Sequence, residues 1–162
     1  MSSGVIDEQG YRLNVGIVVV NQHGELLWGR RVGNPNAWQF PQGGISSDET
    51  PREAMYRELT EELGLNPEDV EYLGETKKWL SYRLPKQFRR YNSKPLCVGQ
   101  KQKWFLLRLL VSDSHINLDK SGTPEFDHWR WVDYWYPLNH VIDFKQTVYQ
   151  KMLKEFEKLV RN

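Results

Sequence analysis

The chain has 162 residues, which is enough for one domain with a substantial hydrophobic core and too few for two domains of typical size. Its formal charge is only +1, and its single cysteine, Cys97, excludes an intramolecular disulfide. The first ten residues lack the basic and apolar regions of a signal peptide, and the apolar run over residues 15–20 is too short to span a bilayer. We therefore expect one cytoplasmic domain over residues 1–162, with no membrane partner.

Short apolar runs bounded by turn residues predict strands in the first part of the chain. We expect strands over residues 11–21, 25–31 and 38–40. A turn at residues 21–24 joins the first two strands into a hairpin. Residues 41–44 contain Pro and two Gly, and we expect them to be a connection that leads into a helix.

The strongest local signals define a helix between Thr50 and Gly64. Thr50 and Glu53 have the spacing of a capping box, and Pro51 suits the first helical position. Gly64 can adopt the left-handed conformation that ends a helix. Between these residues an apolar stripe recurs at every fourth position: Met55, Leu59 and Leu63.

Three glutamates share another face of this predicted helix. Glu58, Glu61 and Glu62 stand at i, i+3 and i+4, rotated by roughly 100° from the apolar stripe. Like charges this close destabilise a helix by about 0.2–0.5 kcal/mol per pair, and a bound cation would reverse that effect. Oxygen ligands without Cys or His favour Mg²⁺ or Mn²⁺ over zinc. The alternative is an acidic face that is simply solvated.

The second half of the chain is predicted to contain further strands. Residues 70–82 are expected to form one or two strands, and residues 102–111 and 128–132 one strand each. Residues 84–99 and 112–127 have mixed polarity and are expected to be loops.

A terminal helix closes the chain. Asp143 and Gln146 have the spacing of a second capping box. The apolar stripe that follows consists of Phe144, Val148, Met152, Phe156 and Val160. Strands, a helix, more strands and a final helix predict an α/β fold in which a mixed sheet lies between helices.

The basic residues are concentrated in one segment. Ten of the 22 Lys and Arg residues lie between Lys77 and Arg108, where there is no Asp or Glu. Aromatic residues interleave with them: Trp79, Tyr82, Phe88, Tyr91, Trp104 and Phe105. Such a tract suits a polyphosphate or single-stranded nucleic acid partner. The alternative is a solubilising surface above core aromatics.

Residues 43–65 resemble a complete Nudix box. Its fixed positions are filled by Gly43, Glu49, Arg57, Glu58, Leu59, Glu61, Glu62, Gly64 and Leu65. Nudix hydrolases cleave a nucleoside diphosphate linked to another group and use divalent metals held by the box glutamates. The resemblance implies an α/β/α sandwich and a metal site for Mg²⁺, or alternatively Mn²⁺, on the three helical glutamates.

The roles within the box stay partly open. Either Glu61 or Glu62 could orient or deprotonate water instead of binding metal. Arg57 could pair with Glu61 or orient the loop that carries Glu49. The loop residues Gly43 and Gly44 permit close backbone approach to phosphate or metal, although turn geometry alone would explain both.

Segments outside the box resemble the bacterial RNA pyrophosphohydrolase branch of the family. They include GYRLNVGIV, WQFPQGGI, KPLCVGQKQKWFLL and TPEFDHWRWVDYWYP. These enzymes convert 5′-triphosphorylated RNA into 5′-monophosphate RNA, which is degraded more readily, so the resemblance implies a role in mRNA decay. Hydrolysis of dinucleoside polyphosphates at the same metal site is the alternative. A silent nucleotide-binding module is a third possibility, and the filled box argues against it.

The same resemblance implies roles for residues outside the box. Glu125 matches a remote acidic position that binds metal or acts as general base. Substrate contacts are expected from Arg12, Arg31, Tyr82, Phe144 and Lys145. Phe144 could stack with Arg31 on a nucleobase, or it could be the first core residue of the terminal helix.

Overall fold

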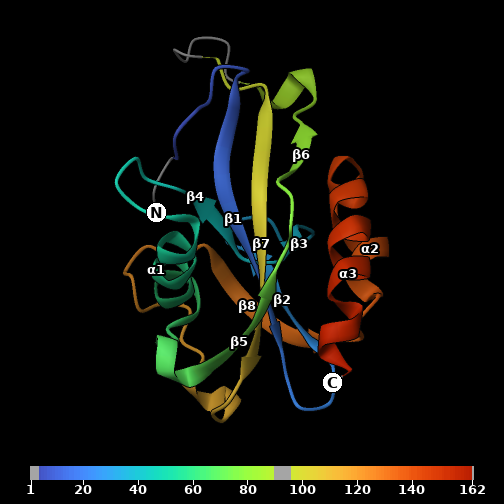
Figure 1. Cartoon of the computed structure of the whole chain (residues 1–162). Helices are drawn as coiled ribbons and strands as arrows, with labels where there is room; N and C mark the ends of the chain where they lie inside the picture. Colours follow the sequence, from blue (N-terminus) through green and yellow to red (C-terminus); the bar gives the residue numbers. More distant parts are fainter. Residues whose placement is uncertain (1–3, 90–95, 162) are drawn as a thin grey trace.

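The computed structural model describes residues 4–89 and 96–161, in which a mixed sheet lies between two helical layers (Figure 1). Helix α1, Pro51–Leu63, covers one face. Helix α3, Gln146–Val160, covers the other face, with the short helix α2, Tyr136–His140, beside it. The expected α/β/α sandwich is confirmed. None of the described helices is long and apolar enough to cross a membrane.

The two longest strands form the parallel centre of the sheet. Strand β1, Tyr11–Val20, pairs in parallel with β7, Gly99–Leu109, along its whole length. The described sheet also contains six shorter strands: β2 (Leu26–Arg31), β3 (Trp38–Gln39), β4 (Gln42–Gly44), β5 (Val70–Glu75), β6 (Leu80–Arg83) and β8 (Phe126–Val132). The order is β3-β2-β1-β7-β5, with β4 paired to β1, β6 to β7 and β8 to β2. Apart from β1–β7, each of these pairs is antiparallel.

The predicted strands are confirmed with small changes at their ends, and the connections differ more. Residues 41–44, expected to be a connection, contain β4, which pairs with residues 14–16 of β1. Residues 70–82 form two strands, β5 and β6. The short helix α2 was not predicted. Its Tyr-Pro-Leu-Asn-His sequence is too short to show a helical period.

The two predicted loops are partly ordered. Residues 84–99 contain a 3₁₀ turn, Lys86–Phe88, while Arg90, Tyr91 and Lys94 of the basic tract lie outside the described residues. Residues 112–127 contain a second 3₁₀ turn, Asp113–His115, and β8 begins two residues earlier than expected.

The predicted capping box of Asp143 and Gln146 is wrong. A 3₁₀ turn, Asp143–Lys145, precedes α3, and Lys145 stands at the helix N-terminus without a side-chain cap. The backbone N–H of Lys145 donates to the carbonyl oxygen of Ile142 at 3.0 Å. This turn satisfies a donor that the cap would otherwise serve, so the chain enters α3 without it.

Each face of the sheet carries its own apolar cluster. The predicted stripe of α1 is fully buried on one face. On the other face Tyr149 of α3 packs in an aromatic group with Trp28, Phe40 and Trp104. The contacting rings have centroids 5.1–6.2 Å apart. The Tyr149 hydroxyl accepts a hydrogen bond from the Phe40 N–H at 3.2 Å. This bond holds α3 close to the segment that leads into β4.

Candidate active site

Helix α1 is fixed at both ends by its own sequence. The Thr50 hydroxyl accepts from the Glu53 N–H at 3.1 Å, and the Glu53 carboxylate accepts from the Thr50 N–H at 2.8 Å, so the predicted capping box is present. Gly64 ends the helix with φ 69° and donates its N–H to the Thr60 carbonyl oxygen at 3.0 Å. With both ends fixed and the apolar stripe buried, the rotation of the helix is set, and so is the direction of its glutamates.

The three helical glutamates form a partly buried carboxylate cluster. The exposed fraction is 0% for Glu58 and 4% for Glu62, and the Glu61 side chain is 31% exposed. One possible ligand atom from each lies within 4.8 Å of the others. In the described part of the chain, Oε2 of both Glu58 and Glu62 is buried without a hydrogen-bond partner. A solvated acidic face is therefore excluded, and the orphaned oxygens fit a hard divalent cation.

The cluster strongly perturbs the ionisation of its members. Burial raises the pKa of Glu58, and its hydrogen bond with Arg57 opposes that rise. Burial also raises the pKa of Glu62 to about 9, and the carboxylates of Glu125 and Glu58 add to the rise. Glu125 therefore lies close enough to act on Glu62, although Glu58, Glu61 and Glu62 make the tighter group.

Arg57 ties this cluster to the loop before the helix. Its Nε and Nη2 donate to the two carboxylate oxygens of Glu49 at 3.0 and 2.6 Å. Its Nη1 donates to Glu58 at 2.7 Å and to Glu61 at 3.3 Å, and its Nη2 also reaches the Gly44 carbonyl oxygen at 2.9 Å. Both roles left open for Arg57 thus occur together. The hydrogen bond from Arg57 holds the pKa of Glu49 below its ordinary value.

Gly43 is required by the close approach of Glu58. A Cβ added at Gly43 would overlap the Glu58 carboxylate. The neighbouring residue of β4, Gln42, extends its side chain toward the opposite face of the sheet, where it meets Gln102 and Lys145. The carboxylate cluster and this second polar group are therefore one residue apart along β4 and on its two sides.

We use the name amide pocket for the side chains of this second polar group, which are Gln39, Gln42, Gln102 and Lys145. Lys145 lies at the centre of the group. Lys145 is only 7% exposed, and its Nζ donates to Gln39 at 3.1 Å and to Gln42 at 3.5 Å. The same ammonium lies 5.8 Å from the Tyr82 ring centroid. Among the ion pairs of the described residues, none joins a carboxylate to Lys145. Burial lowers the pKa of Lys145 to about 8, and Arg31 adds to the decrease.

Two more amides, Asn14 and Gln100, extend this group across the central strands. The Asn14 side chain donates to Gln100 at 2.9 Å, and its Oδ1 is buried without a partner among the described atoms. Gln102 donates to Gln42 at 3.4 Å and accepts from the Trp104 indole at 3.2 Å. The sequence analysis missed these residues. The signal was the alternation of Gln100, Gln102 and Trp104 on one face of an interior strand.

The expected substrate-contact residues gather around this pocket. Tyr82 is 8% exposed, and burial raises its pKa to about 12. Phe144 lies in the 3₁₀ turn before α3, with its ring 5.5 Å from the Tyr82 ring, and it packs against the core while staying partly exposed. Arg31 is exposed at the end of β2, and Arg12 shares a face of β1 with Asn14.

The aromatic residues of the basic tract divide into two groups. Trp104 and Phe105 are fully buried core residues, as expected if the tract were a solubilising surface above core aromatics. Trp79 and Phe88 are exposed instead. Core packing therefore accounts for part of the aromatic content of this segment, and the exposed rings need a different explanation.

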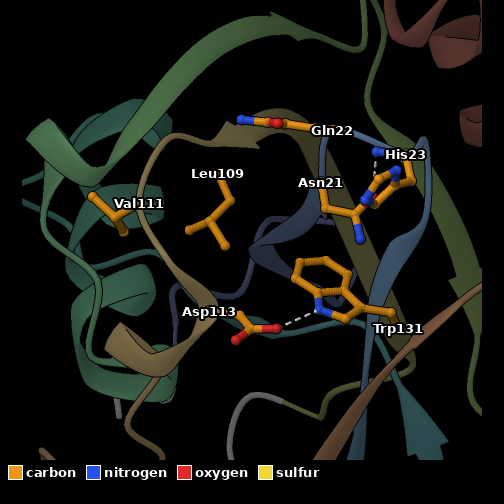
Figure 2. Close-up of a pocket in the computed structure, with 7 residues that line it drawn as sticks. All are labelled: Asn21, Gln22, His23, Leu109, Val111, Asp113 and Trp131. Atoms are coloured by element: carbon orange, nitrogen blue, oxygen red, sulfur yellow. Dashed lines mark hydrogen bonds between the residues drawn. The ribbon is translucent and has the colours of Figure 1, made fainter.

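A separate depression lies at the β1–β2 turn (Figure 2). It is lined by Asn21, Gln22, His23, Leu109, Val111, Asp113 and Trp131. The Trp131 indole donates to Asp113 at 3.1 Å. This depression shares no residue with the carboxylate cluster or the amide pocket, and we assign it no role in the chemistry.

Comparison with known proteins agrees with this geometry. A family profile described as the NUDIX domain matches residues 10–156. An RNA pyrophosphohydrolase from Coxiella burnetii is 61% identical over 162 residues, covering 99% of this chain and 71% of that protein. One from Marinomonas sp. is 62% identical and covers 93% of each chain. The solved structure of the E. coli dihydroneopterin triphosphate pyrophosphohydrolase has the same fold, with TM-score 0.70 at 18% identity, over 88% of this chain and 95% of that one.

Proposed function

The chain belongs to the NUDIX family, and we propose that it is an RNA pyrophosphohydrolase that removes pyrophosphate from 5′-triphosphorylated RNA. We further propose that the product, 5′-monophosphate RNA, enters mRNA decay and that the enzyme acts in the bacterial cytoplasm. The observation that carries the proposal is the buried carboxylate cluster, in which Glu58 and Glu62 each have one buried oxygen without a hydrogen-bond partner among the described atoms. We also propose that residues 1–162 form one NUDIX domain, because both apolar clusters share a single sheet.

The residues suited to hold a divalent cation are Glu58, Glu61 and Glu62, with Glu125 as a further ligand or as general base. We propose Mg²⁺, with Mn²⁺ as the alternative, because all the donors are carboxylate oxygens. When bound, such a cation neutralises phosphate charge and lowers the pKa of bound water. Arg57 restricts Glu58, Glu61 and the Glu49 loop to one arrangement, so the site is held in position before substrate arrives.

Glu61, Glu62 and Glu125 are the candidates for the group that accepts a proton from the attacking water, and we propose Glu62 for this step in place of a role as ligand. Burial and the Glu125 carboxylate raise its pKa in the metal-free protein, so it would accept a proton only when a bound cation favours its ionised form. Glu125 would stabilise the protonated form of Glu62 because two adjacent carboxylates do not readily ionise together. In this arrangement Glu61, the most exposed of the three, remains a ligand.

The amide pocket would bind the nucleotide part of the substrate. Lys145 holds a buried positive charge among neutral amides, which leaves that charge available to an anion or to base acceptors. Arg12 and Arg31 add guanidinium groups at the ends of β1 and β2. Tyr82 and Phe144 supply aromatic surface.

The decisive experiment compares two substrates at equal Mg²⁺ concentration. Pyrophosphate release from 5′-triphosphate RNA should exceed the cleavage of diadenosine tetraphosphate in kcat/KM. The reverse order would favour the dinucleoside polyphosphate hydrolase, which uses the same cluster. Glu62→Gln should abolish both reactions. If it keeps full activity, the proposed chemistry is wrong, and if the wild-type protein cleaves neither substrate, a binding module is favoured.

A further inference from the structure

Three aromatic rings form a row from the amide pocket to the surface. Tyr82 at the inner end is 8% exposed, and Phe88 at the outer end is 51% exposed. Phe144 lies between them, with ring centroids 5.5 Å from Tyr82 and 5.8 Å from Phe88. The interplanar angles are 41° and 44°, and about half of the Phe88 side chain remains exposed to solvent. We call these residues the aromatic row.

The inner end of the row is connected to the carboxylate cluster. Phe144 precedes Lys145, whose ammonium contacts Gln42. Gln42 precedes Gly43, against which the Glu58 carboxylate packs. The cluster and the Lys145–Phe144 end of the row are thus held by neighbouring residues of β4, on the two sides of that strand. The Phe88 ring lies 5.8 Å beyond Phe144, so it is the next aromatic surface outward from a nucleotide bound at Lys145 and Phe144.

Two basic residues, Lys86 and Arg89, flank the outer end of the row in the chain. Phe88 ends the 3₁₀ turn Lys86–Phe88 and is followed by Arg89, whose Nε donates to the Leu84 carbonyl oxygen at 2.9 Å. This bond holds the Arg89 guanidinium beside the turn. The sequence has no Asp or Glu between Lys77 and Arg108. An open aromatic face with cations beside it is suited to an unpaired nucleobase and its phosphate.

We propose that Phe88 stacks on a nucleobase downstream of the 5′-terminal nucleotide and so determines specificity for RNA. This inference rests on the proposed function and extends it, because nucleoside triphosphates have no downstream base to place on Phe88. The preference for RNA over shorter nucleotides would then depend on Phe88 and its basic surroundings, while the chemistry depends on α1.

The test compares Phe88→Ala and Phe88→Leu with the wild-type enzyme on substrates of different length. Leu keeps an apolar contact with Phe144 and loses the aromatic face, so it separates stacking from packing. For 5′-triphosphate RNA of about ten nucleotides, both variants should raise KM about 5- to 20-fold with kcat unchanged, as expected for the loss of one stacked base. KM for ATP and for diadenosine tetraphosphate should change less than about twofold. Phe88→Trp should restore the wild-type KM for RNA.

Trp135→Ala is the matched control. Trp135 is 37% exposed and lies outside the aromatic row, so its removal should leave KM for RNA unchanged. Equal KM values for RNA in Phe88→Leu and wild type would overturn the inference. An equal rise in KM for RNA and ATP would also overturn it, since that would indicate a general disturbance of the site.

A binding measurement distinguishes failure of this inference from failure of the proposed function. If wild-type protein releases no pyrophosphate from RNA, the proposed function fails, and binding of a fluorescent 5′-monophosphate RNA is compared by anisotropy instead. A 5- to 20-fold weaker Kd in Phe88→Leu, roughly the effect of one lost stack, would still support the stacking role. An unchanged Kd, or no binding by the wild-type protein, would refute it.

Discussion

A carboxylate that is almost fully buried beside two others lowers stability whenever it is ionised without a cation, and Glu62 is in this position. Its folded-state pKa is raised from 4.5 to about 9. A group with a raised folded-state pKa favours folding at pH values below its unfolded pKa, and this contribution is lost as pH rises toward the folded value. The metal-free protein should therefore become less stable between pH 5.5 and pH 8.

Glu62→Gln should remove most of this pH dependence. One proton contributes about 1.4 kcal/mol per pH unit, so the wild-type protein should lose at most about 3.5 kcal/mol over that interval of 2.5 pH units. The variant cannot ionise at this position, so its free energy of unfolding should not show this decrease between pH 5.5 and pH 8. The substitution should thus stabilise the metal-free protein while it abolishes turnover. Mg²⁺ should reverse the order at pH 8, because it stabilises the wild-type cluster.

Urea unfolding in EDTA at pH 5.5, 7 and 8, repeated with excess Mg²⁺, measures these differences. Glu61→Gln is the control, because its side chain is 31% exposed and the change should stay below about 1 kcal/mol. Equal pH slopes for wild type and Glu62→Gln in EDTA would refute the reasoning. A variant that is less stable than wild type at pH 8 would refute it as well.

Three further substitutions test other parts of the site. Arg57→Lys keeps the charge and loses the fork toward Glu49, so urea unfolding should show a loss of about 1–3 kcal/mol; an unchanged value would mean that the fork contributes nothing. Gly43→Ala places a methyl group against the Glu58 carboxylate and should weaken Mg²⁺ binding in calorimetry by about 10- to 100-fold, while wild-type affinity would contradict the close approach. Lys145 has a pKa of about 8, so KM for triphosphate RNA should rise between pH 7 and pH 9 as its charge is lost. In Lys145→Gln, KM should be high and constant over that range, and an unchanged pH profile would exclude Lys145 as the titrating group.

The features predicted correctly from the sequence are mostly local. Helix α1 carries its capping box, its stripe and its terminal glycine within a short stretch, so its limits could be predicted to the residue. The glutamate spacing also identified the carboxylate cluster. What the spacing could not show is that Glu58 and Glu62 are buried, because that depends on β4 packing against the helix.

The features that were missed depend on distant parts of the chain. Strand β4 has three residues, two of them glycine, and exists because β1 offers it hydrogen-bond partners. The amide pocket joins Gln42 from β4, Gln102 from β7 and Lys145 from the turn before α3. No local pattern links these residues. The Asp143 cap is absent because the backbone forms a 3₁₀ turn there, in which the Lys145 N–H donates to Ile142.

The alternation of side chains along β4 has a consequence for how such an enzyme can change. Gly43 serves the carboxylate cluster on one side of the strand, and Gln42 serves the amide pocket on the other. Substitutions that reshape the pocket need not disturb the glutamates, because a rigid backbone separates the two. Substrate choice and hydrolytic power can therefore vary separately, in evolution and in the laboratory. A library limited to residues on the α3 side of the sheet would be a rational starting point for redirecting this hydrolase to other nucleotides.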